Sequence, residues 1–238
     1  QDDTIDMPQR ILNHISTSIT GAAVLMAGAT FLSRILGLIR DRIFAYQFGA
    51  GEMLDAYYAA FKIPDLLFNL IILGALSAGF IPVFTKFRKT HGLADSWPIV
   101  QGVTSLGFVA LAIGSAVLFV FADPIMWLVA PGFSESTHAQ SVVFTRVMFL
   151  SPVLLGFSAV LGGALQSLRQ FFVFSLAPIL YNAGIIIGAT IFYSKLGIIG
   201  LAWGVVLGAF LHASIQYIAL LGQGFTLKFS LKLTKEVK

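Results

Sequence analysis

Several basic side chains fall inside segments that are otherwise apolar enough to cross a membrane. Arg34 and Arg40 lie in one such segment and Lys62 in the next. An arginine at the centre of a membrane helix costs about 2.5–3.5 kcal/mol on insertion scales, so the two arginines would cost roughly 5–7 kcal/mol if both faced lipid. We therefore expect them to face an aqueous cavity and bind an anion there, with Lys62 adding charge. For Arg42 and Arg146, nearer to segment ends, we favour an ordinary interfacial position.

Helical spacing sorts the polar residues around these arginines into two faces. Ser33, Gly37 and Arg40 are spaced i, i+4, i+7 and share one face of a helix. Arg34 and Asp41 lie on a second face about 100° away, too far apart for a close pair. We expect Ser33, Gly37 and Asp41 to belong to the cavity or its gate. The alternative is that residues 40–42 only mark the outer end of the helix.

The next apolar segment carries an acidic residue at its start and two prolines. Asp55 can serve the cavity, or it can simply stabilise the positive end of the helix dipole. Pro64 removes a backbone hydrogen bond and predicts a kink, and Pro82 predicts another near the inner end. Small residues in 74–79 predict close helix contact.

The composition places these residues in a membrane protein. Of the 238 residues, 57% are hydrophobic and 11% are charged, whereas a soluble domain is about 45–50% apolar and about 25% charged. This excludes a soluble enzyme, a nucleic-acid-binding domain and a disordered tail. We predict an all-α integral membrane protein whose lobe, 19–222, is a six-helix bundle. The expected spans are 19–48, 53–87, 97–122, 140–166, 171–194 and 197–222.

The flanks of these spans predict the orientation. Counting connections alternately, one side carries nine basic residues and the other only Lys195. Positive residues concentrate on the cytoplasmic side, so residues 1–18 form a cytoplasmic segment and 223–238 a basic cytoplasmic linker. A cleaved signal peptide is disfavoured because no cleavage site follows the first apolar run. The nine residues are Arg10, Lys86, Arg88, Lys89, Arg169, Lys228, Lys232, Lys235 and Lys238.

Motifs of enzymes are missing from the sequence. It has no cysteine, which excludes disulfides and thiolate metal sites. It has no HExxH, Walker A, GxSxG or paired-carboxylate motif. We therefore expect no catalytic residue, no metal site and no cofactor. Polar residues within the spans, such as Asn182, Gln216 and His212, are expected to form hydrogen bonds between helices.

An ordered series of strings resembles the MurJ (MviN) lipid II flippases of the MOP transporter superfamily. The resemblance runs from about residue 18 to 235. Its strings are 33–41, 48–51, 55–57, 60–64, 74–84, 130–133, 145–149, 178–182 and 200–204.

The resemblance implies a fold, an activity and partners. Family members have fourteen helices, twelve of which form two six-helix lobes around a cationic cavity. They move lipid II, the undecaprenyl-diphosphate-linked disaccharide-peptide, from the inner to the outer leaflet of the bacterial inner membrane by alternating access. This chain would be the N-terminal lobe, with membrane lipids and the missing C-terminal lobe as partners. Arg34, Arg40 and Asp55 fall on the family's cavity residues, and any coupling cation is expected outside this segment.

Two positions depart from the family pattern. Phe68 and Leu73 stand where members typically carry an arginine and a glutamate. The departures leave two alternatives open beside the lipid II flippase. One is another MOP exporter, either an oligosaccharide-lipid flippase or a multidrug extruder; the other is a non-transporting membrane scaffold for cell-wall synthesis.

Overall fold

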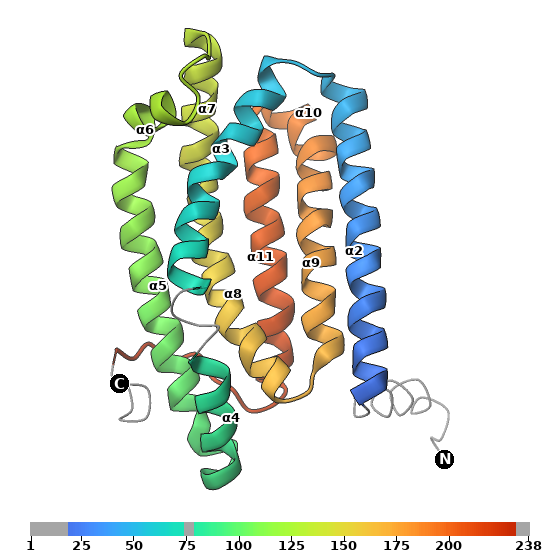
Figure 1. Ribbon diagram of the computed structural model, residues 1–238, viewed down its shortest axis with the longest axis vertical. Helices are drawn as coiled ribbons and strands as arrows, with labels where there is room; N and C mark the ends of the chain where they lie inside the picture. Colours follow the sequence, from blue (N-terminus) through green and yellow to red (C-terminus); the bar gives the residue numbers. More distant parts are fainter. Residues whose placement is uncertain (1–18, 74–78, 232–238) are drawn as a thin grey trace.

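The computed structural model describes residues 19–73 and 79–231, and every regular element in those two ranges is a helix (Figure 1). Long stretches without charged residues favour helices in lipid, because a helix satisfies its own backbone hydrogen bonds. The all-α fold class predicted from the sequence is confirmed. The helices are α2 (Ile19–Phe48), α3 (Glu52–Phe68), η1 (Asn69–Leu73), α4 (Phe80–His91), η2 (Ala94–Ser96), α5 (Trp97–Val120), α6 (Ala122–Val129), α7 (Glu135–Met148), α8 (Leu150–Ser167), α9 (Phe171–Ile187), η3 (Gly188–Phe192), α10 (Tyr193–Leu196) and α11 (Ile199–Leu221).

Five stretches of the described chain are long and apolar enough to cross a membrane: Ala23–Phe48, Ala94–Val120, Glu135–Ser167, Phe171–Leu196 and Ile199–Leu221. The expected span 53–87 contains residues 74–78, which are outside the described residues. The six-span count therefore stays a prediction, as does the close packing expected at 74–78.

The two prolines of this region occupy different places. Pro64 is buried inside α3, which continues to Phe68 and then widens into the π-helical turn η1. Pro82 lies in the first turn of α4 rather than inside a longer described helix. A missing N–H costs little in a first turn, since no carbonyl there needs it.

The expected helix 140–166 begins earlier and is divided. The hydroxyl of Ser134 accepts a hydrogen bond from the Thr137 backbone N–H at 3.3 Å, which caps α7. Phe149 separates α7 from α8. Pro152 then falls in the first turn of α8, where it is tolerated.

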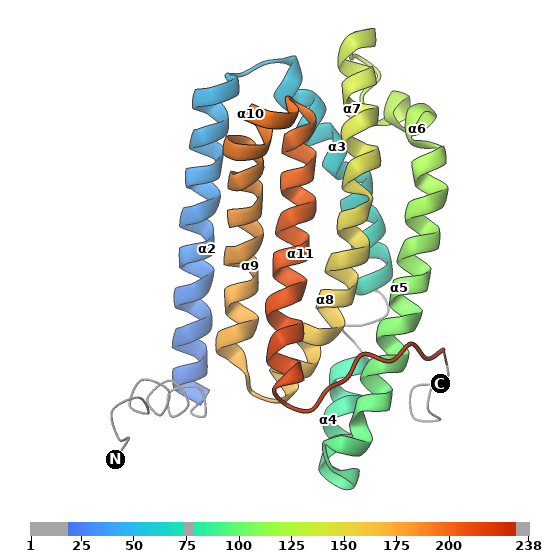
Figure 2. The same ribbon diagram turned by 180° about the vertical axis from the view of Figure 1, so that it is seen from behind.

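The spans lie side by side with α8 near the middle of the bundle. Both views place α2, α9 and α11 in a row, with α8 and then α5 beyond α11 (Figure 2). Helix α3 packs on α7 and α8 but makes few contacts with α2, although only a short turn connects them. The space between α2 and α3 is therefore bounded behind by α8 and α9.

Helices α9 and α11 approach each other through glycines. A Cβ added to Gly204 would lie 2.5 Å from the Cα of Gly188, and one added to Gly184 would lie 2.3 Å from the Cα of Gly208. Small residues at such spacing let membrane helices pack backbone to backbone. This seam fixes α9, which carries part of the candidate site.

The basic flanks gather at one end of the bundle. Helix α4, the turn between α8 and α9, and the extended segment after α11 share that end, whereas α10 and the turn between α2 and α3 lie at the other (Figure 1). The first end carries Lys86, Arg88, Lys89, Arg169 and Lys228, and the second carries Lys195. Arg10, Lys232, Lys235 and Lys238 lie outside the described residues.

Candidate functional site

A hydrogen-bond chain links Arg40 on α2 to α9. Arg40 Nη1 donates to Asn182 Oδ1 at 3.2 Å, and Asn182 Nδ2 donates to Ser33 Oγ at 3.2 Å. The same amide nitrogen also donates to the Pro178 carbonyl oxygen at 3.1 Å. Asn182 is buried, so the chain of bonds holds both Ser33 and Arg40 against α9. This agrees with the shared helix face expected for these two residues, and Asn182 forms the interhelical bonds expected of it.

Asp41 fixes the other side of the same guanidinium. Arg40 Nε donates to Asp41 Oδ1 at 2.9 Å, and Nη2 lies 2.9 Å from that oxygen. The Arg40 side chain is 28% exposed. A guanidinium carries five N–H donors, so one N–H on each terminal nitrogen has no partner among the described residues. The arginine is oriented by protein groups and still able to bind a ligand.

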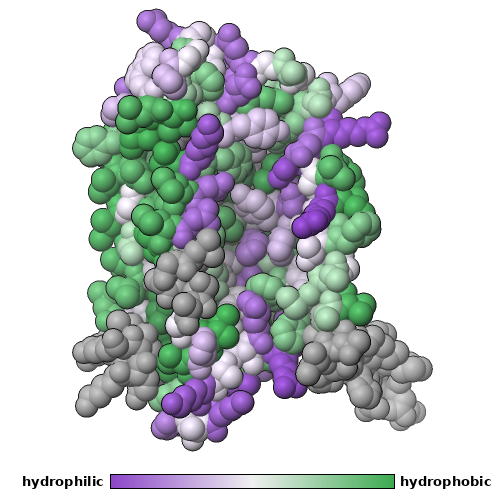
Figure 3. All heavy atoms as spheres, viewed as in Figure 1, coloured by the Kyte–Doolittle hydropathy of each residue, from purple (hydrophilic) through white to green (hydrophobic). Residues whose placement is uncertain are grey.

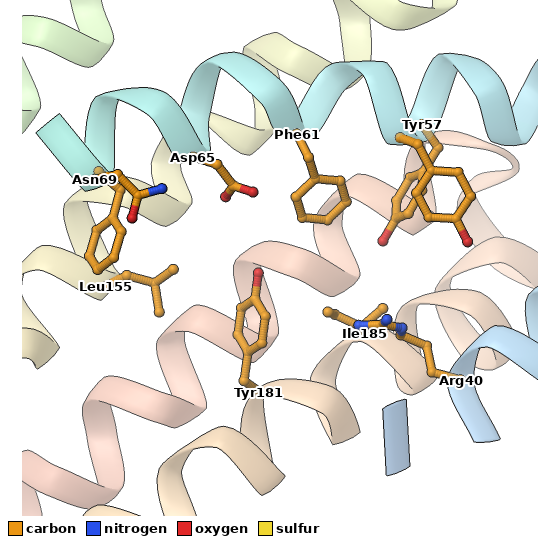
Figure 4. Close-up of a pocket in the computed structure, with 10 residues that line it drawn as sticks. Arg40, Tyr57, Phe61, Asp65, Asn69, Leu155, Tyr181 and Ile185 are labelled. Carbon is orange, nitrogen blue, oxygen red and sulfur yellow. The ribbon is translucent and has the colours of Figure 1, made fainter. Parts of the chain in front are cut away.

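Arg40 lines a cavity of about 530 Å³ between α2 and α3 (Figure 4). In the space-filling view, the middle of this face is hollowed and coloured pale to purple, and most of the surface on either side of it is green (Figure 3). The lining combines aromatic rings with few charged groups. It consists of Arg40, Tyr57, Tyr58, Phe61, Asp65, Phe68, Asn69, Leu155, Tyr181 and Ile185.

Asp65 is the acidic member of this lining, and sequence reasoning did not select it. Asp65 on α3 and Tyr181 on α9 point into the cavity from opposite walls (Figure 4). No described side chain donates a hydrogen bond to the carboxylate, and Arg40 pairs with Asp41 instead. The signal was present, because Tyr58, Phe61 and Asp65 follow the i, i+3, i+7 spacing of one helix face.

The structure brings only some of the expected site residues to this cavity. Arg34 is exposed on α2 with no hydrogen bond or ion pair to the described part of the chain, and it does not line the cavity. Lys62 and Asp55 are exposed on α3 and also lie outside the lining. Gly37 is half-buried, and a Cβ added there would meet nothing within 4 Å. Their roles stay predictions.

Phe68 and Leu73 mark the departures from the family pattern. Phe68 lines the cavity, so this wall presents an aromatic ring at the position where the resemblance leads us to expect an arginine. Leu73 ends η1. Within residues 19–73 and 79–231, no group of three or more His, Asp or Glu side chains could hold a metal ion.

A second polar cluster ties the start of α3 to the start of α7. Glu52 accepts hydrogen bonds from the hydroxyl groups of Thr137 and Ser134, the latter at 3.1 Å. These bonds, led by the one from Thr137, lower the pKa of the Glu52 carboxyl below its ordinary value, because they favour its charged form. The cluster lies at the end of the bundle opposite the basic end.

Comparison with solved structures defines the class of protein. The fold matches a MOP superfamily transporter from Pyrococcus furiosus with a TM-score of 0.70 at 14% identity, over 91% of this chain and 49% of that one. It also matches a lipid II flippase MurJ in an inward closed conformation, with a TM-score of 0.69 at 26% identity, over 88% of this chain and 44% of that one. The fold is that of one lobe of a MOP transporter.

Sequence comparisons narrow the class to a family. The family model "Lipid II flippase MurJ" matches residues 44–238. The lipid II flippase MurJ of Burkholderia cenocepacia is 32% identical over 199 residues, which cover 82% of this chain and 39% of that protein. A probable lipid II flippase MurJ of Borreliella burgdorferi is 33% identical over 211 residues, covering 87% of this chain and 40% of that protein.

The chain therefore belongs to the MurJ family, as the sequence strings predicted. It spans about two fifths of the length of these curated relatives. Flippases are transporters, so the family membership agrees with the absence of enzyme motifs.

Proposed function

We propose that this chain is one lobe of a lipid II flippase and that Arg40 binds the diphosphate of the substrate. The observation that carries the proposal is the hydrogen bonding of the Arg40 guanidinium. Asn182 and Asp41 hold its guanidinium, while one N–H on each terminal nitrogen faces an open cavity. Arginine binds phosphate oxygens through charge-assisted and often bidentate hydrogen bonds. A pre-oriented guanidinium loses less entropy when it does so.

The lobe works with a second lobe by alternating access. The cavity between α2 and α3 opens away from the core of this lobe, so a facing lobe would complete it. Rocking of the two lobes would expose the diphosphate to one leaflet and then the other. The polyprenyl tail would stay in lipid throughout. Moving net charge across the membrane is worth about 2.3 kcal/mol per charge per 100 mV, so the membrane potential can contribute to the direction of transport.

The site residues outside the cavity lining keep assigned roles in this scheme. Arg34 and Lys62 are exposed on α2 and α3 and would attract the anionic headgroup as it enters. Asp55, in the first turn of α3, would pair with a cation of the facing lobe at the outer gate. No catalytic step is assigned to any residue.

The proposed location is the bacterial inner membrane. The end of the bundle formed by α4, the α8–α9 turn and the segment after α11 would face the cytoplasm because, among the described basic residues of the connections and flanks, it carries five and the other end carries only Lys195. Both flanking segments, 1–18 and 223–238, would then be cytoplasmic.

Complementation tests the assignment of Arg40. The protein containing this chain, at the length its gene encodes, is expressed in cells depleted of their own lipid II flippase. Arg40→Ala should abolish growth at normal expression. Arg42→Ala is the matched control, since Arg42 is exposed on the same helix and lies outside the cavity lining. Normal growth with Arg40→Ala would remove the assignment.

One observation supports a second candidate, another MOP exporter. The described lining of the cavity contains one arginine, Arg40, and the carboxylate of Asp65, and Phe68 stands where the family resemblance leads us to expect a cation. A less anionic substrate than lipid II would suit such a cavity. Purified protein that binds a different polyprenyl-linked glycan but not lipid II, and that gains lipid II affinity on Asp65→Asn, would favour this candidate.

A further inference from the structure

A second hollow lies on the opposite side of α8 from the Arg40 cavity. It has a volume of about 990 Å³ and is bounded by α5, α7, α8 and α11. Leu154 faces this groove and the adjacent Leu155 lines the Arg40 cavity, so α8 separates the two spaces. In Figure 2, α8 lies between α5 and α11 on this face. The groove is therefore a distinct site on the side of the lobe away from the proposed substrate path.

Arg146 is the only charged residue that lines the groove, among the described residues. It lies in the last turn of α7, and its guanidinium carbon stands 5.5 Å from the centre of the Phe119 ring. Its Nε is buried and has no hydrogen-bond partner in the described chain. The Ser115 hydroxyl, which lines the same groove, is also buried without a described partner. The ring faces the cation but accepts no conventional hydrogen bond from Nε. A buried donor without a partner is costly, so these groups call for an acceptor.

The position of Arg146 places that acceptor near one membrane surface. Phe119 is in the last turn of α5, which ends at Val120 before the short helix α6. This end of α5 is opposite the basic end of the bundle. The guanidinium therefore sits at the depth where a lipid phosphate can reach it, as snorkelling arginines do.

The groove continues along the membrane as a path for an apolar chain. A second cavity of about 510 Å³ shares Phe108, Val153 and Leu154 with the first. It extends to Leu227 and Phe229 in the segment after α11. That segment is held on α5, because Gln101 Nε2 donates to the Thr226 carbonyl oxygen at 2.7 Å. The groove thus has a cation at one end and a long apolar path toward the other. A lipid, with a charged headgroup and an apolar chain, matches this arrangement.

We propose that this groove binds an anionic phospholipid, with the phosphate on Arg146 and an acyl chain along α5 and α8. Arginine suits a phosphate because its planar donors match two phosphate oxygens. The described lining holds no Asp or Glu that would pair with the ammonium of a zwitterionic headgroup, so a net negative lipid is favoured. The polyprenyl diphosphate is disfavoured, because α8 separates this groove from the Arg40 cavity.

Native mass spectrometry of the purified, delipidated protein at its gene-encoded length tests the proposal. Phosphatidylglycerol and phosphatidylcholine with identical chains serve as probes. The wild type should retain phosphatidylglycerol at least tenfold more tightly than phosphatidylcholine, and Arg146→Gln should abolish that preference. Arg42→Gln, on α2 and outside this groove, should keep it.

A variant that leaves the charge in place checks the apolar path. Ala112 lines the groove on α5, so Ala112→Phe should weaken phosphatidylglycerol binding at least fivefold even if Arg146→Gln fails to fold. Val117→Phe is its control, because Val117 is exposed on α5 outside the groove. Equal retention of the two lipids by the wild type would overturn the proposal. So would unchanged binding by Ala112→Phe, or displacement of the phospholipid by undecaprenyl phosphate at equal concentration.

Discussion

Arg40 on α2 and Asn182 on α9 are joined by a hydrogen bond of 3.2 Å, although they are separated by 142 positions in the chain. The amide oxygen of Asn182 accepts a hydrogen bond from the guanidinium, and its amide nitrogen donates one to Ser33. Asn182 therefore binds two residues on the same face of α2. The glycine seam between α9 and α11 holds Asn182 in place. The orientation of the proposed diphosphate-binding group thus depends on the packing of a helix that contributes no charge.

Replacing this amide should weaken substrate binding while Arg40 is still present. Asn182→Ala removes a hydrogen bond to a charged group, worth about 1.5–3 kcal/mol, so we expect roughly tenfold or greater loss of lipid II affinity. Titration of the purified gene-length protein with lipid II measures it. Thr190→Ala is the control, because Thr190 is exposed on η3 and, among the described residues, its hydroxyl bonds only the Ile186 carbonyl oxygen one turn earlier in α9. Unchanged affinity in Asn182→Ala would mean that Arg40 does not need this support.

Placing a cation at position 68 should strengthen anion binding. Phe68 lines the cavity that contains Arg40 and Asp65. Phe68→Arg adds a second donor for phosphate oxygens, and one charge-assisted bond of about 1.5 kcal/mol corresponds to roughly a tenfold gain in lipid II affinity. Phe68→Leu separates loss of the ring from gain of charge and should not tighten binding. A weaker affinity in Phe68→Arg than in Phe68→Leu would argue against a diphosphate at this wall.

The sequence predicts much of this architecture, because the backbone N–H and C=O groups of each long apolar segment must form their hydrogen bonds within a helix. The spacing of Ser33 and Arg40 likewise predicts their common face, and His212 forms the expected interhelical bond with Ser158 at 2.7 Å. The break at Phe149 and the early start of α7 were missed. They depend on the Ser134 cap and on packing that periodicity does not encode.

The candidate site was predicted less completely, since a cavity is a property of several helices together. The cost of charges in lipid selected both Arg34 and Arg40, yet only Arg40 lines the cavity. The insertion cost of a charge is the same on any face of a helix, so it selects both arginines and does not tell which of them borders the cavity. Asp65 and Tyr181 were missed because their shared cavity depends on how far α3 stands from α9, which no local pattern specifies.

The Glu52 cluster should make the α3–α7 connection sensitive to acid. Hydrogen bonds from Thr137 and Ser134 lower the folded-state pKa of Glu52 below its ordinary 4.5. A carboxyl with a depressed pKa contributes stability that is present above the unfolded-state pKa and is lost as the pH falls through the folded-state pKa. The wild type should therefore melt higher than Glu52→Gln at pH 7, and the difference should shrink below pH 4.5. Thermal melting of the purified protein across that range measures it.

A neighbouring carboxylate provides the control for this pH effect. Glu135 is exposed in the first turn of α7, and no described side chain bonds it. Glu135→Gln should therefore follow the wild-type pH profile. If Glu52→Gln also followed it, the hydrogen bonds to Thr137 and Ser134 would contribute nothing to the stability of the fold.

The glycine seam should tolerate no added methyl group. Gly204 on α11 faces Gly188 on η3, and a Cβ at Gly204 would lie 2.5 Å from the Gly188 Cα. Backbone atoms cannot move aside as a flexible side chain can, so Gly204→Ala must separate the helices, at an overpacking cost of about 1–3 kcal/mol. Gly107→Ala on α5 is the matched control, since a Cβ there meets nothing within 4 Å. It should be neutral or slightly stabilising, because alanine favours helix over glycine. Thermal unfolding of both variants in the same detergent compares them, and equal melting temperatures of the two variants would refute the close approach.

The seam also positions Asn182, so the same substitution should affect the substrate. Gly204→Ala should lower lipid II affinity, whereas Gly107→Ala should not.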